Sequence, residues 1–382
     1  MHQMSSMNGL DRPFGSGIEL VFPGLAQQDQ ALFHHYMTVT TLSITTDLKR
    51  LDRWRSFIPS AAKEAKYTLH SLLGFSALHL AHIKRQRRRE YLAVATSHQC
   101  QALATFRSEV ETITQENATP VLVFSCFLIL YELGLMHPNH QICDVQDPIT
   151  RFVQSVMLIH NAVNSLRQVP WLKVGPVMHL LLRSTRENTP RVPPEVYQAL
   201  GQLDILNETT TADEHERQTY TDAIQHLRDC FEVVSVSPGE WLPSLRWANL
   251  VSSQYVETIR EKRPMALVIL VHFCLLVHHS PERWWMRGWN ETIVNETMQL
   301  LDEPWRPHLL WAVESMSDKP LLESSGKGIP SHENISPTEP MLKRAASFMP
   351  GDAPSMLPLR SIQDAPLALF PRTYSPQSVP YV

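Results

Sequence analysis

Apolar residues recur along most of this chain at the spacing of an α-helix. From Arg88 to Gln115 they follow one stripe, which consists of Tyr91, Leu92, Ala95, Ala102, Leu103, Phe106, Val110 and Ile113. After Asp147 the same period returns in Phe152, Val156, Ile159, Val163 and Leu166. Residues three and four positions apart share one face of a helix, so both stretches are predicted to be amphipathic helices that bury one face.

Two other segments, residues 71–83 and 121–136, are apolar on nearly every side and predict central helices with several neighbours. A further apolar run covers residues 265–277. The two longest runs, 121–136 and 265–277, are interrupted by Glu132 and His272 respectively. Both are shorter than the ~20 residues that a membrane-spanning helix needs, so we expect buried helices and no membrane span.

Composition supports the same fold class. The chain has only 13 glycines but 28 prolines among its 382 residues, whereas sheet-rich and dinucleotide-binding folds need glycine in their turns. No segment sustains the alternation of apolar and polar residues that indicates a strand. We therefore expect an all-α, multi-helix domain followed by a disordered, proline-rich C-terminal tail.

Changes in composition mark the expected boundaries. Residues 1–27 are predicted to be a disordered N-terminus, and residues 28–319 to form one all-helical body. Residues 320–382 contain 11 of the prolines and are predicted to be disordered, because such a segment buries too little apolar surface to offset its ordering entropy. The polar, proline-containing stretch 184–211 predicts either a long surface loop or a seam between two halves, near 184–215.

Neither charge nor cysteine content indicates a DNA-binding surface. The formal net charge of −4 provides no overall attraction to nucleic acid. No CxxC pair occurs, so cysteine alone predicts no zinc site, and we expect reduced, buried thiols. The five cysteines are Cys100, Cys126, Cys143, Cys230 and Cys274. The N-terminus lacks the basic and then apolar pattern of a signal peptide.

The 18 histidines raise the question of a metal site, since His79 and His82 stand three residues apart, as do His137 and His140. A metal ion needs further ligands, and no acidic residue lies within one turn of His79 and His82 on the same face. We expect neither a metal nor another cofactor. The sequence also lacks the HExxH, GxGxxG and GxSxG motifs. We therefore expect no catalytic residue and no enzymatic activity.

One dense basic run allows two interpretations. It consists of Lys84, Arg85, Arg87, Arg88 and Arg89. Such a run could be a nuclear-import signal or a patch that contacts phosphate. It could equally be a solvated corner between two helices, where cations complement the C-terminal dipole of the helix before it. The corner is the favoured interpretation.

Residues 263–316 concentrate tryptophan behind a nearly uncharged apolar run. Five of the nine tryptophans are here: Trp284, Trp285, Trp289, Trp305 and Trp311. A stripe of this kind is more often core than ligand site, but aromatic clusters also line small-molecule pockets. The residues that we expect to line such an apolar pocket are Ile269, His272, Phe273, Leu276, Trp285, Trp289 and Trp311.

Several sequence phrases recur in the order known from one family. They are FSALHLA, YLAxAxxHQxxAL, ALVILVHF, WWxxGW and WRPHLLW, and they lie within residues 71–107 and 263–316. With these phrases the chain resembles the regulatory domain of fungal zinc-binuclear-cluster transcription factors and, within that family, the sterol uptake control protein group. The resemblance covers roughly residues 28–318.

The resemblance implies an all-α regulatory domain that senses an apolar or sterol-like small molecule and controls transcription. The genes it controls would serve sterol uptake or a secondary-metabolite pathway. It also implies other transcription regulators as partners and a nuclear location, with shuttling from the cytoplasm. Family members carry six closely spaced cysteines before this domain, whereas no cysteine here precedes Cys100. We therefore expect no direct DNA binding by this chain, and zinc only where such a cluster is present. The alternative is a non-enzymatic helical interaction scaffold.

Overall fold

The computed structural model describes most of the predicted helical body. The described residues are 22–45, 47–137, 140, 147–167, 190–236, 240–280 and 283–317. Of the predicted disordered segments, residues 1–21 and the whole of 320–382 lie outside this part of the chain. The predicted domain boundaries therefore stay predictions.

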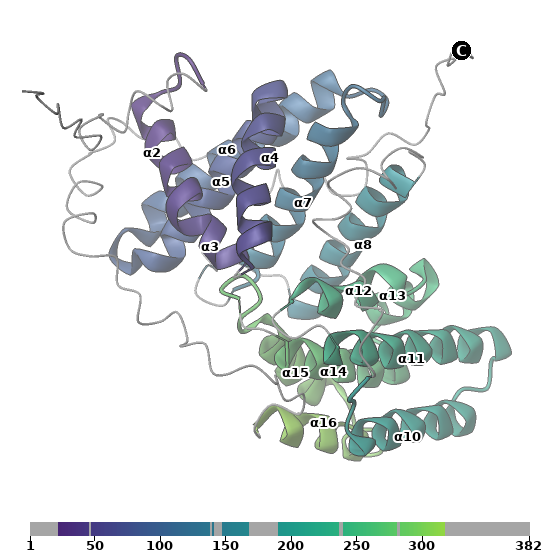
Figure 1. Ribbon diagram of the computed structural model, residues 1–382. Coiled ribbons are helices and arrows are strands. Elements are labelled where there is room, and N and C mark those ends of the chain that lie inside the picture. The colour runs from purple at the N-terminus through teal and green to yellow at the C-terminus, as the bar shows by residue number, and fades with distance from the viewer. Residues whose placement is uncertain are drawn as a thin grey trace, which may run out of the picture.

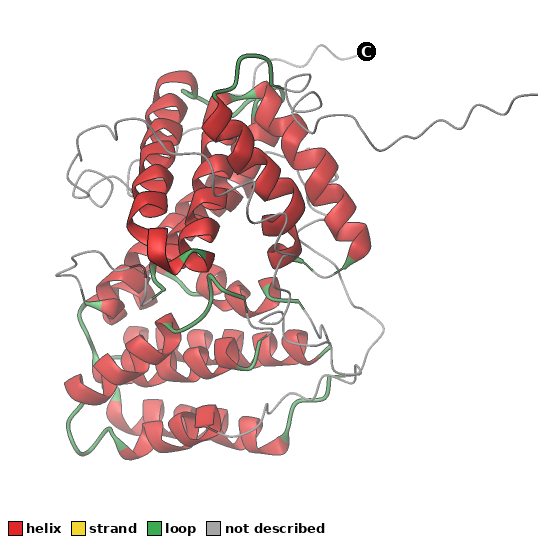
Figure 2. Ribbon diagram, turned by 90° about the vertical axis from the view of Figure 1, so that its left-hand side faces the viewer, coloured by secondary structure: helices red, strands yellow, loops and turns green. Residues whose placement is uncertain are grey.

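The described residues are helical and include no strand, which confirms the all-α prediction (Figure 2). In Figure 1 one group of helices forms the upper part of the molecule. It contains α2 (Gln27–His35), α3 (Thr41–Ile44), α4 (Leu48–Glu64), α5 (Lys66–Ile83), α6 (Arg88–Glu109), α7 (Ala118–Leu135) and α8 (Pro148–Arg167). A short π-helical turn, Tyr36–Thr40, joins α2 to α3.

The second group forms the lower part of the molecule, and its longer helices run across the direction of the first group (Figure 1). It contains α10 (Pro194–Thr210), α11 (Glu214–Ser235), α12 (Leu242–Leu250), α13 (Ser253–Arg260), α14 (Pro264–His278), α15 (Trp289–Leu300) and α16 (Pro307–Ser317). One continuous hydrophobic cluster includes buried residues of both groups. The two parts therefore share a core.

Three helices occupy the centre, as their apolar sequences predict. Every residue from 265 to 277 of α14 is buried, and α5 and α7 are buried along most of their length. Helix α5 packs against α4, α6 and α7, while α14 packs against α11, α15 and α16. A smaller core cluster lies between α5, α6 and α7, where the rings of Phe106 and Phe124 stack with centroids 4.5 Å apart.

Helix α7 alone among the described helices is long and apolar enough to cross a membrane. The apolar run 121–136 seen in the sequence is too short for a membrane span, but the helix itself has 18 residues. However, 72% of this 18-residue stretch is buried inside the protein. Its contacts with α4, α5 and α8 are those of a core helix.

The sequence prediction for the middle of the chain was partly wrong. Residues 194–210 form helix α10 and not a surface loop, while residues 168–189 lie outside the described part. Pro194 occupies the first helical position, where its missing N–H removes no hydrogen bond. The apolar residues Val196, Leu200 and Leu203 recur at helical spacing and are buried. The prolines thus start a helix, and the alternative of a seam near 184–215 stays a prediction.

Local capping explains where other helices begin. Asp147 caps α8 by accepting a hydrogen bond from the backbone N–H of Thr150 at 3.0 Å. Helix α7 begins at Ala118, and Pro120 lies in its first turn, where a helix tolerates a residue without an N–H. The amphipathic stripe predicted after Arg88 extends beyond the helix that carries it, because α6 ends at Glu109, before Val110 and Ile113.

Candidate ligand site in the tryptophan-rich core

The predicted pocket residues on α14 all lie inside the protein. Ile269, His272, Phe273 and Leu276 are buried together with the rest of the helix. Pro264 provides a favourable first helical position, and the run that follows contains no charged residue before His278. With apolar neighbours on every side, α14 presents side chains to α11, α15 and α16 at once. The helix is therefore the axis about which the candidate site is arranged.

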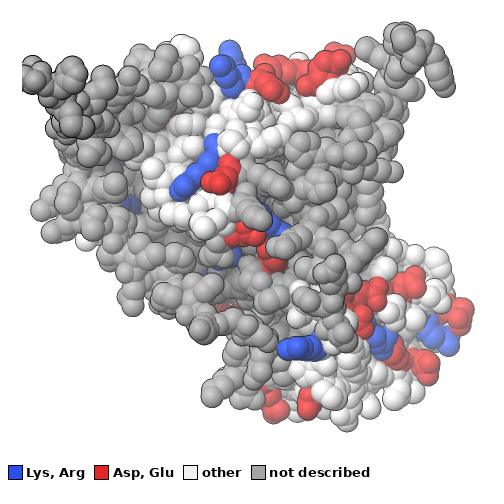
Figure 3. Space-filling view, viewed as in Figure 1, with Lys and Arg blue, Asp and Glu red and all other residues white. Residues whose placement is uncertain are grey.

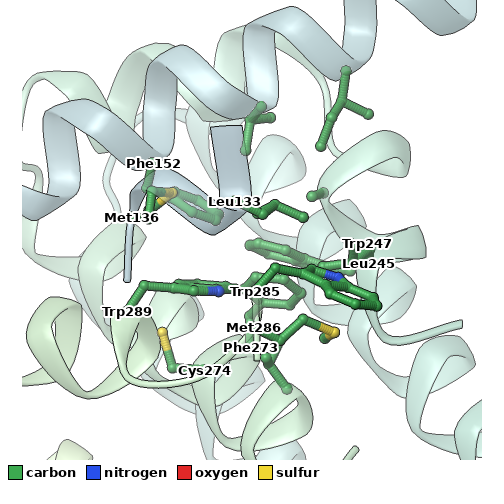
Figure 4. Packing of buried hydrophobic residues seen from close by; sticks show 14 of the residues in the cluster. Leu133, Met136, Phe152, Leu245, Trp247, Phe273, Cys274, Trp285, Met286 and Trp289 are labelled. Atoms are coloured by element: carbon green, nitrogen blue, oxygen red, sulfur yellow. The ribbon is translucent and has the colours of Figure 1, made fainter. Parts of the chain in front are cut away.

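Trp289 reaches the face of α14 that carries Phe273. It is the first residue of α15, and Gly288 before it has φ 85°, a left-handed conformation that glycine adopts without steric strain. The Trp289 ring lies 5.9 Å from Phe152 of α8 and 6.4 Å from Phe273, centroid to centroid. Phe273 in turn stacks on Trp247 at 4.4 Å. Figure 4 shows these rings together in the core.

The other two predicted tryptophans lie in separate surroundings. Trp285 is fully buried and packs edge to face against Trp241 at 5.6 Å and Phe75 at 5.8 Å. Trp311, on α16, is partly exposed and stacks on His272 with centroids 5.9 Å apart. The predicted tryptophans therefore belong to one hydrophobic core but make three separate groups of aromatic contacts.

Two indole nitrogens in this region have no hydrogen-bond acceptor among the described residues. They are Nε1 of Trp285 and Nε1 of Trp289, and both are buried. By contrast, the Nε1–H of Trp247 donates to the carbonyl of Ala223 at 2.8 Å, and that of Trp241 donates to Ile44 at 3.0 Å. Buried polar groups are normally paired. The two indoles thus offer donors to an oxygen atom brought by a ligand.

The polar side chain on α14 carries no charge. The Nδ1–H of His272 donates to the carbonyl of Val268 at 2.9 Å. Burial lowers the pKa of His272 to about 4, against an opposing effect of that hydrogen bond. Burial also raises the pKa of the Cys274 thiol. A neutral imidazole, a neutral thiol and aromatic rings are suited to a neutral, mostly apolar molecule.

The basic run forms the corner between α5 and α6. Lys84 follows the last residue of α5, a 3-10 turn covers Arg85–Arg87, and α6 begins at Arg88. Arg87 pairs with Glu90 at 2.8 Å and lies over the ring of Tyr91, with its guanidinium carbon 5.2 Å from the centroid. The favoured prediction of a helix corner is confirmed. Arg85 and Arg89 are exposed, so the position leaves the interpretation as an import signal open to test.

A surface pocket that sequence patterns did not reveal lies on the second group of helices. Its volume is about 480 Å³, and it opens to solvent. It is lined by Asp213, Glu216, Gln254, Glu257, Thr258, Glu261 and Arg263. Arg263 already pairs with Glu216 and Glu261, each at 2.6 Å. This lining is polar, with four acidic residues against one basic residue, and does not match an apolar ligand. Figure 3 shows acidic and basic side chains interspersed over one face of the molecule.

Known proteins provide a context for this fold. No family model matches the sequence. Over 309 residues the chain is 25% identical to a Zn(2)-C6 fungal-type transcription factor of Gibberella zeae, which covers 74% of this chain and 60% of the relative. Over 105 residues it is 34% identical to Sterol uptake control protein 2 of Saccharomyces cerevisiae, which covers 27% of this chain and 11% of the relative.

The chain thus spans less than two thirds of the length of either relative. The Gibberella zeae relative is named as a transcription factor and the Saccharomyces cerevisiae relative as a control protein of sterol uptake, and the longer match extends over most of the helical body. These matches and the all-helical fold confirm the resemblance of this chain to the regulatory domain of fungal zinc-cluster transcription factors.

Proposed function

We propose that this chain is the regulatory, ligand-sensing region of a fungal transcription regulator, and that an apolar small molecule enters its tryptophan-rich core. The observation that carries the proposal is the pair of buried indole N–H groups of Trp285 and Trp289 without acceptors. The relatives named above support the transcriptional role. The proposed lining consists of Ile269, His272, Phe273, Leu276, Trp285, Trp289 and Trp311.

The ligand class follows from the chemistry of that lining. Large aromatic surfaces favour a rigid apolar skeleton, and indole N–H groups favour a hydroxyl or carbonyl oxygen on it. A sterol combines both features, and one relative is named for the control of sterol uptake. An apolar secondary metabolite with one oxygen would satisfy the same donors. None of the proposed lining residues is charged, because His272 is neutral at ordinary pH.

Ligand binding would act by changing how helices pack. Trp289 contacts Phe152 of α8, and Trp285 contacts Phe75 of α5, so both indoles connect the second group of helices to the first. A ligand that binds one arrangement more tightly than another shifts the population toward it. The shift would alter a surface for other transcription regulators or the exposure of the basic run at the α5–α6 corner.

The proposal includes a nuclear location, with shuttling from the cytoplasm, and no enzymatic activity. It assigns no direct DNA contact to the described residues. The names of the chain's relatives and the helical fold support a role in regulation. Fusing the full chain to an unrelated DNA-binding domain and measuring a reporter gene with and without added sterol tests this role. An unchanged reporter under both conditions would contradict it.

The ligand is tested by purifying the full chain from a sterol-containing host and identifying bound lipid by native mass spectrometry. Trp285→Phe and Trp289→Phe each remove one donor without an acceptor, and both should lower lipid recovery. Trp247→Phe is the matched control, because it removes an equally large indole whose N–H is already bonded to Ala223. It should retain the lipid.

A helical interaction scaffold without a ligand is the second candidate. The close stacking of Phe273 on Trp247 at 4.4 Å favours it, since aromatic rings there already fill the space between helices. Repeated recovery of lipid-free protein, together with an unchanged melting temperature on adding sterols, would select the scaffold.

A further inference from the structure

Three histidines from separate parts of the sequence meet at one end of the first group of helices. His82 lies in the last turn of α5, while His137 and His140 follow the C-terminus of α7. One ring nitrogen from each side chain lies within 4.8 Å of one from each of the others. His137 and His140 are 4% and 3% exposed, and His82 is partly buried.

A short turn holds two of these side chains in position. The backbone N–H of His140 donates to the carbonyl of His137 at 2.8 Å, and the N–H of His137 donates to Gly134 at 3.3 Å. Their rings have centroids 4.9 Å apart, and the ring of His82 lies 5.1 Å from His137 and 5.9 Å from His140. The three rings thus form a compact group.

The hydrogen bonding of His140 leaves a nitrogen lone pair directed away from its backbone partner. Its Nδ1 lies 2.7 Å from the carbonyl oxygen of Gly134, which can only accept, so Nδ1 carries the proton. In the neutral ring Nε2 is then an acceptor. This atom is buried and has no hydrogen-bond partner among the described residues. Histidines that bind metals commonly make this second bond to a carbonyl or carboxylate.

The environment keeps these rings deprotonated, as metal ligands must be. Burial is the largest cause that lowers the pKa of His82 to about 4 and of His137 to about 3, and it also lowers the pKa of His140. Neighbouring imidazoles lower the first two further. Arg88 acts in the same direction on all three, and Arg287 acts on His82 and His137.

We propose that His82, His137 and His140 bind a divalent transition metal ion of the zinc class. Imidazole nitrogen is a preferred ligand of zinc, nickel and copper, and three histidines can complete three positions of a tetrahedral site. In such a site, bonds of about 2.0–2.1 Å to zinc place the nitrogens ~3.4 Å apart. Small side-chain rotations would close the present separations to that value.

Nearby cations shape what the fourth position accepts. Arg88 and Arg287 oppose a bare divalent charge but favour an anionic ligand on the metal, such as hydroxide, chloride or a carboxylate. The expectation from sequence that no metal binds considered His79 with His82, and His137 with His140, as separate pairs. The third and second ligands come instead from residues more than 50 positions later, which helix packing brings to His82.

The site has a natural optical reporter. The indole of Trp284 stacks on His79 at 5.0 Å and lies 5.4 Å from the ring of His82. It also lies 6.3 Å from His140. A bound paramagnetic ion such as Co²⁺, Ni²⁺ or Cu²⁺ would therefore quench tryptophan fluorescence, and Zn²⁺ would shift it.

The test titrates metal into the full chain, prepared without an affinity tag and stripped with a chelator. We expect Co²⁺ to give d–d absorption bands of a tetrahedral site at one ion per chain. Zn²⁺ should displace Co²⁺ and raise the melting temperature. His140→Gln and His82→Gln should each weaken Zn²⁺ binding by at least about tenfold, the scale on which loss of support for a ligand acts.

His215→Gln serves as the control, because His215 is exposed at the start of α11. It should leave the metal affinity unchanged. His82 is only partly buried, so its variant should fold even where His140→Gln does not; far-ultraviolet circular dichroism without metal verifies folding. Binding of equal strength in wild type and the His82→Gln variant, or no binding at all by wild type, would overturn the proposal.

Discussion

Trp284 and Trp285 are neighbours in the chain but belong to different regions of the molecule. Their ring planes stand at 90° to one another. Trp284 turns toward the histidines at the end of α5, and its Nε1–H donates to Ser43 at 3.1 Å. Trp285 turns into the aromatic core against Phe75 and Trp241, and its Nε1–H has no acceptor among the described residues.

The two regions differ in the kind of buried nitrogen atom that lacks a hydrogen-bond partner among the described residues. Beside Trp284, Nε2 of the His140 imidazole has no hydrogen-bond partner among the described residues; it offers a lone pair and suits a cation. In the core, the indoles of Trp285 and Trp289 offer protons and suit an oxygen. Two buried regions of one fold thus leave unpaired nitrogen atoms of opposite character, one an acceptor and the others donors.

The largest effect is expected from a change of volume in the aromatic core. Phe273→Ala removes a fully buried ring that stacks on Trp247. The free energy of unfolding should fall by ~3–5 kcal/mol, as expected for a large cavity in a packed core. Urea denaturation measures it. In metal-free protein, His140→Gln should cost less, because it mainly removes one hydrogen bond of ~1 kcal/mol.

A loss from Phe273→Ala no larger than that from His140→Gln would contradict this comparison. It would mean that the core around Trp247 and Trp289 relaxes around an empty volume. Such a result would argue that the region is loosely packed before ligand binding.

The next largest effect is a loss of folding stability in acid, to which the buried His272 contributes. Its folded-state pKa is about 4, below the ordinary value of 6.5, chiefly because of burial, with His308 of α16 acting in the same direction. Above pH 6.5 both folded and unfolded chains hold it neutral. Between pH 6.5 and 4 only the unfolded chain gains the proton, so stability falls by up to ~1.4 kcal/mol per pH unit.

The measurement is the free energy of unfolding of the wild type and of His272→Gln at several pH values. The glutamine variant should show a shallower decline below pH 6.5. Other buried histidines, such as His35 with a pKa of about 3, also lower the stability of the folded chain over this pH range. They should account for the decline that remains in the glutamine variant. Identical slopes for the two proteins would exclude a contribution from His272.

The smallest effect separates paired from unpaired indoles. Trp247→Phe and Trp289→Phe remove the same atoms from buried positions, but only the first breaks a hydrogen bond. In ligand-free protein, Trp247→Phe should therefore be the more destabilising by ~1 kcal/mol. Thermal and urea unfolding measure the difference. An equal or larger loss for Trp289→Phe would show that its N–H does have an acceptor.

Local sequence predicted much of the fold. The apolar sequence of residues 265–277 required a buried helix, whatever its neighbours, because no polar face was available to meet water. The corner at Lys84 also followed from local charge. The prediction of a loop at 194–210 was wrong because proline breaks a helix in its interior but is tolerated at its first position, where Pro194 starts α10.

The candidate site was predicted as a list of residues but not as an arrangement. The sequence placed Trp285 and Trp289 in one apolar stretch, whereas packing separates them onto different partners, Phe75 and Phe152. Which indole has an acceptor depends on carbonyls far along the chain, such as Ala223 for Trp247. No periodicity carries that information.

By itself, the sequence determined that this chain folds into helices, and which of them are central, because helical period and apolar content are local properties. Only the tertiary structure decided that His82 meets His137 and His140, and that Trp284 and Trp285 face different regions. The physical reason is that these contacts depend on how α5, α7 and α14 cross, which many distant residues set together.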